Sequence, residues 1–460
     1  MNKVTIPRIV IAGTQSGVGK TTIVTGLLAA LKQQGLKVQS YKVGPDYIDP
    51  GYHALASGQA AHNLDTWLIP PEKIQSVFIQ TARGNDIALI EGVMGLYDGG
   101  KNGISSTAAI AKLLDAPVIL VIDAKSMGES AAALVLGFKQ YDPELKLAGV
   151  IVNRLGSDSH GMIVEEALNR IGVPVLGKIR RSDELVTPER HLGLTPTSET
   201  DSIAIVEKMG FHMRRQIELP KISAIARSAA PLWYETPNKN IDKARTRIGI
   251  AFDEAFSFYY PASLAVLERL GAELVYFSPL RDRSLPLVDG LFFGGGFPEM
   301  FVRELAENQT MLQQISDAGR QGMPIVAECG GFMYLTREMV DFSGQSFPLV
   351  GLIPGVCAME RKLQTVGYVE ATAKSDNVVC ARGQTLRGHE FHFSTFIPDA
   401  AYDKYWAFQF KKMRTGKCYN GGFVCGNTVA SYLHMHFLGC PTAAQRFVDR
   451  CATFCVSRGV

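Results

Sequence analysis

Five apolar runs without polar alternation recur through the first 180 residues, and stretches with helical periodicity separate them. Strands of this kind are usually buried on both faces, which is typical of a parallel sheet covered by helices. The runs are 36–43, 86–91, 117–123, 147–153 and 174–179. In such sheets ligands bind beyond the carboxyl ends of the strands, so polar residues at those ends are the first candidates for a site.

The pattern changes after Pro188, and a second alternation of strands and helices starts near residue 247. The stretch 214–245 between them contains Pro220, Pro231 and Pro237, scattered charges and no sustained periodicity, which predicts a linker. We therefore expect a first α/β domain over 1–213, a linker over 214–245 and a second α/β domain over 246–460. A chain of 460 residues is also longer than one hydrophobic core usually stabilises, which again indicates more than one domain.

Composition narrows the class of protein further. The 47 basic and 44 acidic residues give a net charge of +3, which provides no electrostatic argument for nucleic acid. No apolar run approaches membrane-spanning length and no signal peptide is evident, so we expect a soluble, cytoplasmic protein without a membrane partner. All eight cysteines lie between Cys329 and Cys455, and most should be buried apolar residues.

Between residues 8 and 22 an apolar strand breaks into glycines and then enters a helical pattern. Glycines let backbone N–H groups face a polyphosphate, and the helix start adds positive dipole. Lys20 can reach the outer phosphates of ATP, and the Thr21 hydroxyl can ligate Mg²⁺. A glycine-rich turn without nucleotide is the alternative. The residues expected to contact ATP are Gly17, Gly19, Lys20, Thr21 and Thr22.

The spacing of this loop differs from the standard one, because Thr14 stands where the first glycine is expected and Gly13 lies one position earlier. The longer form resembles the loop of the dethiobiotin synthetase and MinD-like branch of P-loop proteins. Ser16 stands where the MinD-type loop has an additional lysine.

Four acidic residues follow two of the strand-like runs: Asp46 and Asp49 follow the run 36–43, and Glu91 and Asp98 follow the run 86–91. Each alone could be an ordinary turn residue. A hard cation that bridges ATP phosphates takes one or two carboxylates and a hydroxyl, so we expect a Mg²⁺ site formed by Thr21, Asp46 and Glu91. Asp49 and Asp98, with the adjacent Tyr47, then remain to position the acceptor substrate or a second Mg²⁺.

Asn153 ends the strand-like run 147–153. Its amide could read an adenine edge by donating and accepting hydrogen bonds, which makes it a candidate nucleotide contact. Capping of the next helix is the alternative.

Cys329 stands between an apolar strand and a glycine-led helix start. A side chain on such a sharp turn is held out at the sheet edge, where the helix N-terminus lowers the thiol pKa. The amides of Gly295, Gly296 and Gly330 could hold an oxyanion, and His434 provides a distant base. A buried structural cysteine is the alternative, but the two glycine contexts favour a nucleophile.

These motifs carry a resemblance that spans nearly the whole chain. The second domain resembles class I (triad) glutamine amidotransferases of the cobyric acid synthase type, and the chain as a whole resembles the cobyrinate a,c-diamide synthase family. The motifs are the loop 13–22 and the segments 44–50, 91–98, 387–394 and 432–437. The expected fold is a dethiobiotin synthetase-like P-loop domain with a parallel sheet, followed by an amidotransferase-like α/β domain.

The resemblance implies ATP-dependent amidation of the a and c acetate side chains of a tetrapyrrole, with L-glutamine as the nitrogen donor. Cobyrinate is the expected substrate, through acyl phosphates, and hydrogenobyrinate and nickel-sirohydrochlorin are alternatives. The macrocycle, its metal and the oligomeric state, including a homodimer, are left open. A MinD-like switch ATPase is the rival from another class, but it would not need an amidotransferase domain.

One position departs from the wider amidotransferase pattern. Many triad enzymes have a glutamate two residues after the histidine, and here His436 occupies that position. We therefore expect a Cys329–His434 dyad and a packing or substrate-contact role for His436. A strand-like segment nearby contains Arg387, His389, Glu390 and His392, which either form an interdomain network or help to bind the macrocycle.

Overall fold

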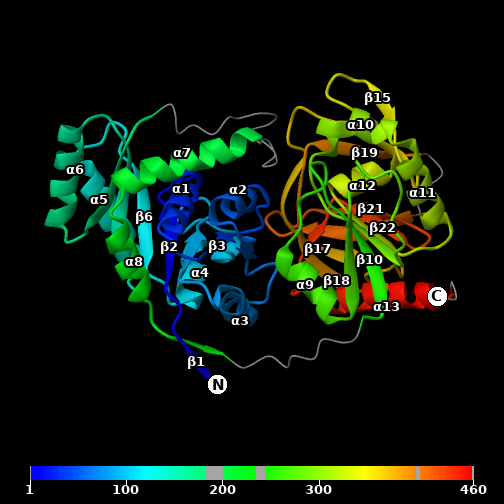
Figure 1. The fold of residues 1–460 in the computed structure, drawn as a ribbon, viewed down its shortest axis with the longest axis horizontal. Coiled ribbons are helices and arrows are strands. Elements are labelled where there is room, and N and C mark those ends of the chain that lie inside the picture. Colours follow the sequence, from blue (N-terminus) through cyan, green and yellow to red (C-terminus); the bar gives the residue numbers. More distant parts are fainter. Residues whose placement is uncertain (1, 183–199, 235–243, 400–404, 458–460) are drawn as a thin grey trace. The chain divides into compact units, whose positions relative to one another are not determined.

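The computed structural model describes residues 2–182, 200–234, 244–399 and 405–457, so the change of pattern at Pro188 lies outside the described residues. The chain divides into two compact units, Met1–Pro237 and Asn238–Val460 (Figure 1). No helix in the described part of the chain combines the length and apolar character needed to cross a membrane.

The first unit is built on a parallel sheet of seven strands in the order β4-β3-β5-β2-β6-β7-β8. This confirms the expected parallel sheet, and the five apolar runs differ from the observed strands by at most two residues at either end. The strands are β2 (Arg8–Gly13), β3 (Val38–Val43), β4 (His62–Leu64), β5 (Ile87–Glu91), β6 (Val118–Asp123), β7 (Leu147–Leu155) and β8 (Val175–Arg180).

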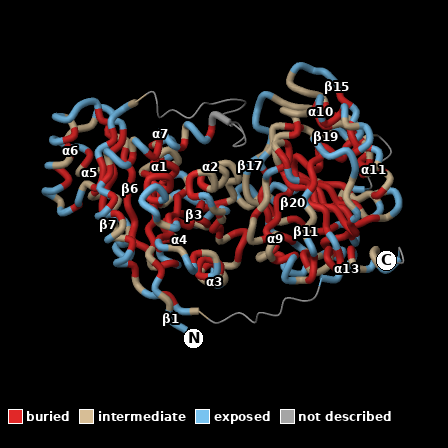
Figure 2. The backbone as a smooth tube through the Cα atoms, viewed as in Figure 1, coloured by how far each residue is buried: buried red, intermediate tan, exposed pale blue. Residues whose placement is uncertain are grey.

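Helices cover this sheet, and its central strands are buried (Figure 2). One apolar cluster joins the inner sides of α1, α7 and α8 to strands of the sheet. The remaining elements are α1 (Lys20–Gln33), α2 (Ile48–Ser57), α3 (Pro71–Ala82), η1 (Lys101–Gly103), α4 (Thr107–Leu113), α5 (Ser130–Tyr141), α6 (Asp158–Arg170), α7 (Thr200–Gln216), α8 (Leu219–Arg227), and the strands β1 (Asn2–Val4) and β9 (Leu232–Tyr234).

Residues 214–234 were expected to be linker, but they are folded parts of the first unit. They contain the end of α7, all of α8, and β9, which pairs antiparallel with β1. Pro220 does not break this region because it stands in the first turn of α8, where a missing N–H costs nothing. Ile222 and Ala226 of α8 are fully buried. The expected linker is therefore wrong for 214–234, and residues 235–243 lie outside the described part.

The second unit contains a ten-stranded mixed sheet in the order β11-β10-β12-β13-β22-β21-β20-β17-β18-β23. The first five strands of this order are parallel and the others pair antiparallel. The strands are β10 (Thr246–Ala251), β11 (Ala272–Phe277), β12 (Gly290–Phe293), β13 (Ile325–Glu328), β17 (Thr365–Ala373), β18 (Thr385–His392), β20 (Trp406–Lys412), β21 (Cys418–Cys425), β22 (Thr428–Ser431) and β23 (His434–Met435).

A smaller sheet of four strands, in the order β15-β14-β16-β19, completes the second unit. The apolar clusters on the two faces of the large sheet include residues of α11 and of α13. These elements are β14 (Thr336–Val340), β15 (Ser346–Pro348), β16 (Ile353–Met359), β19 (Ser394–Pro398), α9 (Pro261–Arg269), η3 (Pro298–Phe301), α10 (Val302–Glu307), α11 (Gln309–Arg320), α12 (Gly330–Leu335) and α13 (Pro441–Ser457).

Candidate active sites

The phosphate loop connects β2 to α1, and its last residue, Gly19, has a left-handed backbone with φ of 93°. Lys20 opens the helix. Its Nζ donates hydrogen bonds to the carbonyl oxygens of Gln15 (3.2 Å) and Met94 (2.5 Å), so the ammonium group lies over the loop. Burial, followed by the neighbouring ammonium of Lys42, lowers the pKa of Lys20 to about 8. A cation held this way is stabilised by any phosphate that enters the loop.

A buried network of charged and polar side chains lies at the carboxyl ends of β3 and β5. The Thr21 hydroxyl is 2.8 Å from Oε1 of Glu91 and 3.1 Å from Oδ2 of Asp49. Lys42 Nζ donates to the same two oxygens, at 2.7 Å and 2.5 Å. The other oxygen of Glu91 accepts from Nε2 of His53 at 2.6 Å. Hydroxyl, carboxylates and ammonium therefore converge at the first turn of α1, beside the phosphate loop.

Because the network is buried, its charges depend on one another. Burial alone would lower the pKa of Lys42, but Asp49 and Glu91 outweigh burial and raise it. Burial would likewise raise the pKa of Glu91, yet Lys42 and His53 hold it well below its usual range. The pKa of Asp49 rises to about 7, because it is buried and shares one lysine with a second carboxylate. Glu91 is thus the firmly ionised member of the network.

The structure places Asp46 differently from the expected metal set of Thr21, Asp46 and Glu91. Oδ1 of Asp46 accepts hydrogen bonds from the first two N–H groups of α2, at 2.8 Å and 3.4 Å, so this oxygen caps the helix. Asp49, which we expected on the acceptor side, instead shares the Thr21 hydroxyl with Glu91. The reason is local: Asp46 stands two residues before the first residue of α2, where its side chain can accept from the free N–H groups, and Asp49 falls within the first turn.

The other expected acceptor residues lie in turns near the network. Oδ2 of Asp98 accepts from the backbone N–H of Gly95 at 3.0 Å, which is the turn role weighed as the alternative for such an acid. Tyr47 is half-buried at the start of α2, and Thr22 is half-buried in the first turn of α1. Among the described residues, no three or more His, Cys, Asp or Glu side chains form a cluster suited to a metal ion.

Sequence reasoning missed two members of the network, Lys42 and His53. Lys42 is the one charged residue of β3, and a lysine in a buried strand needs a partner, which was an available signal. His53 follows Asp49 by four residues on α2, so the two share a helix face. Neither signal indicates Glu91 as the common partner, because that contact joins two strands that are distant in sequence.

Asn153 packs against the phosphate loop. Its Nδ2 donates to the carbonyl oxygen of Val18 at 2.8 Å, and a Cβ added to Gly19 would lie 2.4 Å from that nitrogen. Helix α6 is capped by Ser157, so the capping alternative for Asn153 is wrong. Arg154, which we had not singled out, donates to the carbonyl oxygen of Gly17 at 2.9 Å. The end of β7 therefore supports the loop, and an adenine contact by Asn153 stays a prediction.

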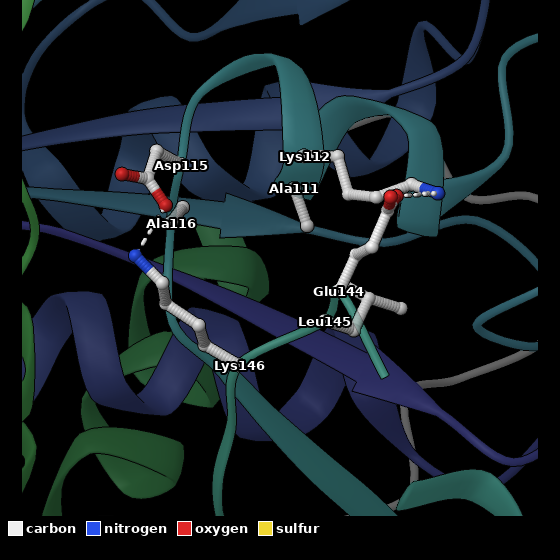
Figure 3. A pocket seen from close by; sticks show the side chains of 7 residues that line it. All are labelled: Ala111, Lys112, Asp115, Ala116, Glu144, Leu145 and Lys146. Atoms are coloured by element: carbon white, nitrogen blue, oxygen red, sulfur yellow. Dashed lines mark hydrogen bonds and ion pairs between the residues drawn. The ribbon is translucent and has the colours of Figure 1, made fainter. Parts of the chain in front are cut away.

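A cavity of about 210 Å³ in the first unit lies away from these residues (Figure 3). It is lined by residues that precede β6 and β7, at the amino ends of those strands. Its charged side chains pair with each other: Lys146 with Asp115 at 2.5 Å, and Lys112 with Glu144 at 3.3 Å. The phosphate loop follows the carboxyl end of β2, so this cavity is not part of the candidate site.

In the second unit, Cys329 stands on a sharp turn between β13 and α12. Its φ of 47° and ψ of −102° are unusual for a residue with a side chain, and this strain is typical of a nucleophile turn. Its backbone N–H donates to the carbonyl oxygen of Ser431 at 2.7 Å. Burial, then the nearby carboxyl of Glu299, raise the pKa of the thiol, although the Gly330 N–H lowers it. The expected low thiol pKa is therefore wrong, and a nucleophile here needs a base.

His434 in β23 is the candidate base. Burial lowers its pKa to about 3, so the imidazole is neutral in the resting site. Its Nδ1 lies 3.6 Å from Oε2 of Glu328, the residue directly before Cys329. His436, in contrast, stacks on Tyr260 with ring centres 4.8 Å apart, which is a packing role. Sequence reasoning missed Glu328, because its only signal was a charged residue ending an apolar strand.

The glycines expected to bind an oxyanion come together from two turns. A Cβ added to Gly330 would lie 3.0 Å from the backbone nitrogen of Gly296, so the two amides are neighbours. Gly296 has no room for a side chain, since a Cβ would lie 2.0 Å from the carbonyl oxygen of Ala255. Gly295 lies against His434, whose Cε1 would be 2.7 Å from an added Cβ. Nucleophile turn, base and candidate donors thus share one region.

The segment with Arg387, His389, Glu390 and His392 forms the end of β18, which pairs with β23 so that His389 lies opposite His434. The rings of these two histidines are 5.1 Å apart. His392 stacks on Tyr432 with ring centres 3.7 Å apart, and Glu390 accepts from the hydroxyl of Tyr419. These contacts lie within the second unit, and among them the His389 ring is the one that lies beside His434.

In comparisons with known proteins, each unit matches a family model. Residues 9–194 match the family model described as the CobQ/CobB/MinD/ParA nucleotide binding domain, and residues 247–441 match the CobB/CobQ-like glutamine amidotransferase domain. Among solved structures, chloroplast FtsY from Physcomitrella patens aligns with a TM-score of 0.30 and 18% identity over 45% of this chain and 66% of that chain, which is too low for inference.

Several curated relatives align over almost their whole length. Cobyrinate a,c-diamide synthase of Dehalococcoides mccartyi strain CBDB1 is 45% identical over 98% of this chain and 99% of its own. Hydrogenobyrinate a,c-diamide synthase of Streptomyces coelicolor is 41% identical over 97% and 98%. Cobyrinate a,c-diamide synthase of Salmonella typhimurium is 42% identical over 95% and 97%. The chain therefore belongs to the cobyrinate and hydrogenobyrinate a,c-diamide synthase family.

Proposed function

We propose that this protein uses ATP and L-glutamine to amidate the a- and c-acetate carboxylates of cobyrinate, in cobalamin biosynthesis. The observation that carries the proposal is that one chain, alignable with full-length diamide synthases, contains both a phosphate-loop network and a cysteine–histidine site. A nucleotide switch of the MinD type would need the first but has no use for the second.

The phosphate-loop unit would activate the carboxylate. A carboxylate is a poor electrophile, and transfer of the γ-phosphoryl group of ATP converts it to an acyl phosphate that ammonia displaces with release of phosphate. Lys20 and the loop amides stabilise charge on the transferring group. Lys42, held between Asp49 and Glu91, adds a second buried cation on the same side.

The side chains of Thr21, Asp49 and Glu91 fit a Mg²⁺ ion. Two carboxylate oxygens within hydrogen-bond distance of one hydroxyl form the hard-oxygen set that Mg²⁺ takes when ATP and water complete its shell. When bound, the ion would neutralise charge on the ATP phosphates. His53 holds the outer oxygen of Glu91, so the inner oxygen faces Thr21. Asp46, Asp98 and Tyr47 then remain for the acceptor side.

The second unit would supply the ammonia. Cys329 Sγ attacks the amide carbonyl of glutamine while His434 takes the thiol proton and passes it to the leaving ammonia. The amides of Gly296 and Gly330 receive the oxyanion. Water then hydrolyses the thioester and gives glutamate. Burial raises the pKa of the thiol and lowers that of the imidazole, so both groups stay neutral in the resting site and the thiolate forms only as it attacks.

A mass-spectrometric amidation assay tests the proposal. Cobyrinate, hydrogenobyrinate and nickel-sirohydrochlorin are offered side by side with ATP, Mg²⁺ and either glutamine or an ammonium salt. We expect two carboxyl groups of cobyrinate to be converted to amides only with ATP, and each exchange of OH for NH₂ slightly lowers the mass of the product. ATP turnover that is independent of every macrocycle would favour the switch, and a preference for another macrocycle would correct the substrate.

A further inference from the structure

The candidate glutaminase site lacks an acid where many related sites have one, two residues after the histidine. His436 occupies that position and stacks on Tyr260, and its Nδ1 accepts from the backbone N–H of Leu438 at 3.3 Å. It is therefore engaged in packing. A histidine that becomes an imidazolium in a buried site still needs a counter-charge, because an isolated buried charge is costly.

Glu328 is the carboxyl group that lies next to that histidine. It ends β13, is 3% exposed, and its Oε2 lies 3.6 Å from Nδ1 of His434. Its other oxygen accepts from the backbone N–H of Met435 at 3.1 Å, so the carboxyl group is fixed by the residue that follows the histidine. The strand pairing of Glu328 with Ser431 fixes the main chain as well.

We propose that Glu328 is the positioning carboxylate of the glutaminase site and orients His434 through Nδ1. This inference rests on the proposed function of Cys329 and His434. With Nδ1 turned to Glu328, the Nε2 atom of the imidazole is the one left to take the proton of Cys329. Burial raises the pKa of the Glu328 carboxyl to about 8 in the resting site, where the imidazole is neutral. As the imidazolium forms, its charge favours the ionised carboxylate, and the two groups then attract each other across the 3.6 Å gap. The acid thus comes from the residue directly before the nucleophile.

A purely structural role is the alternative, because Glu328 also accepts the N–H of Met435. Two substitutions separate these roles. Glu328→Gln keeps the shape and an oxygen acceptor for that N–H but removes the charge. Glu328→Asp keeps the charge on a side chain one methylene shorter, which fits the contact less well. If Glu328 orients His434 through its charge, Glu328→Asp should retain more glutaminase activity than Glu328→Gln. If its role is only structural, Glu328→Gln should retain more.

The experiment measures glutaminase kcat and KM, together with ammonia-dependent amidation, for the full-length protein and its variants. We expect Glu328→Gln to lose about 10²-fold or more in kcat, with KM for glutamine changed less than about threefold, as for loss of a triad carboxylate. The kcat of Glu328→Asp should be about tenfold higher than that of Glu328→Gln. Ammonia-dependent amidation, which needs an intact fold but no glutaminase, should stay within about twofold.

Ser263→Ala is the matched control. It removes the side chain that accepts the N–H of Phe437, which lies in the same segment as His434, and should leave kcat within about threefold. An equal or reversed ranking of Asp and Gln, or loss of ammonia-dependent activity in Glu328→Gln, would overturn the role of Glu328. Cys329→Ser and His434→Ala run alongside: if they retained glutamine use, the proposed glutaminase site itself would fail.

Discussion

At the scale of single residues, the first unit contains buried charged side chains that the formation of its turns does not explain. Lys42 is 4% exposed, and Glu91 and His53 are fully buried. Burial of an ion costs several kcal/mol unless it is paired, and removal of one partner of a buried pair costs about 3–5 kcal/mol. Here one lysine forms ion pairs with two carboxylates, so the charge balance of the network changes when a cation or a phosphate is added. Such a network is expected of a binding site.

Lys20 should make MgATP binding depend on pH. Its pKa in the free protein is lowered to about 8, and a bound phosphate raises it, so affinity is full below about pH 8 and falls as pH rises above it. The loss should approach tenfold per pH unit. Calorimetric titration with an unreactive ATP analogue from pH 6.5 to 9.5 measures it.

The control for this prediction is Lys20→Gln, which retains the other groups that face Lys20, namely Lys42, Glu91, Asp49 and Asp98. The difference between the parent and the variant isolates the titration of Lys20. Equal slopes for both proteins above pH 8 would assign the dependence to another group.

The two histidines of the 432–437 segment should differ sharply in their effect. His434→Ala removes the base and should abolish glutamine-dependent amidation while activity with ammonium salts persists. His436→Ala removes a ring stacked on Tyr260 and should retain much of the glutaminase rate, with a loss of stability. Glutaminase assays and urea unfolding of both variants provide the measurements. The reverse ranking of the two rates would identify His436 as the base.

At the scale of elements, the apolar pattern predicts buried strands and other local features. It does not predict features that depend on contacts between residues distant in sequence. Most parallel strands of the first unit follow from apolar runs, although β3 contains Gln39, Ser40 and Lys42, and β4 has only three residues and no run of its own. The sequence did not predict helix α8, because Pro220 is typical of a helix break, although here it lies in the first turn of the helix. The Lys42–Glu91 and Glu328–His434 contacts join separate strands, and no spacing along the chain encodes them.

The start of α2 allows the two neighbouring aspartates to be separated. Asp46→Ala removes a helix cap, so we expect a loss of about 0.5–2 kcal/mol in the free energy of unfolding and only a small change in MgATP affinity. Asp49→Ala removes a carboxylate that contacts Thr21 and Lys42, so nucleotide affinity should fall more. Urea unfolding and titration with an ATP analogue test both. Greater loss of affinity in Asp46→Ala would restore the metal set expected from the sequence.

At the scale of the whole molecule, two chemistries occupy two separately folded units. The chain divides between Pro237 and Asn238, inside the stretch that proline content had suggested as linker. Phosphate-loop and cysteine motifs were visible in the sequence because each is local, a few residues at the end of one strand. The roles of the supporting residues were not visible, because Lys42, His53 and Glu328 meet Glu91 or His434 only through contacts between separate elements. The two sites can therefore be disabled one at a time.

This separation predicts how nitrogen source and mutation combine. Lys20→Ala and Glu91→Ala act on phosphoryl transfer, which precedes amide formation, and excess ammonia cannot replace a missing acyl phosphate. Both variants should therefore lose amidation with glutamine and with ammonium salts alike, by about 10²-fold or more. Their glutaminase site is untouched, so hydrolysis of glutamine should remain measurable.

Cys329→Ser should give the opposite result, losing only glutamine-dependent amidation. Parallel assays of all three variants with both nitrogen sources decide the matter. Ammonia-dependent turnover at the parental rate in Lys20→Ala would remove the phosphate loop from the reaction.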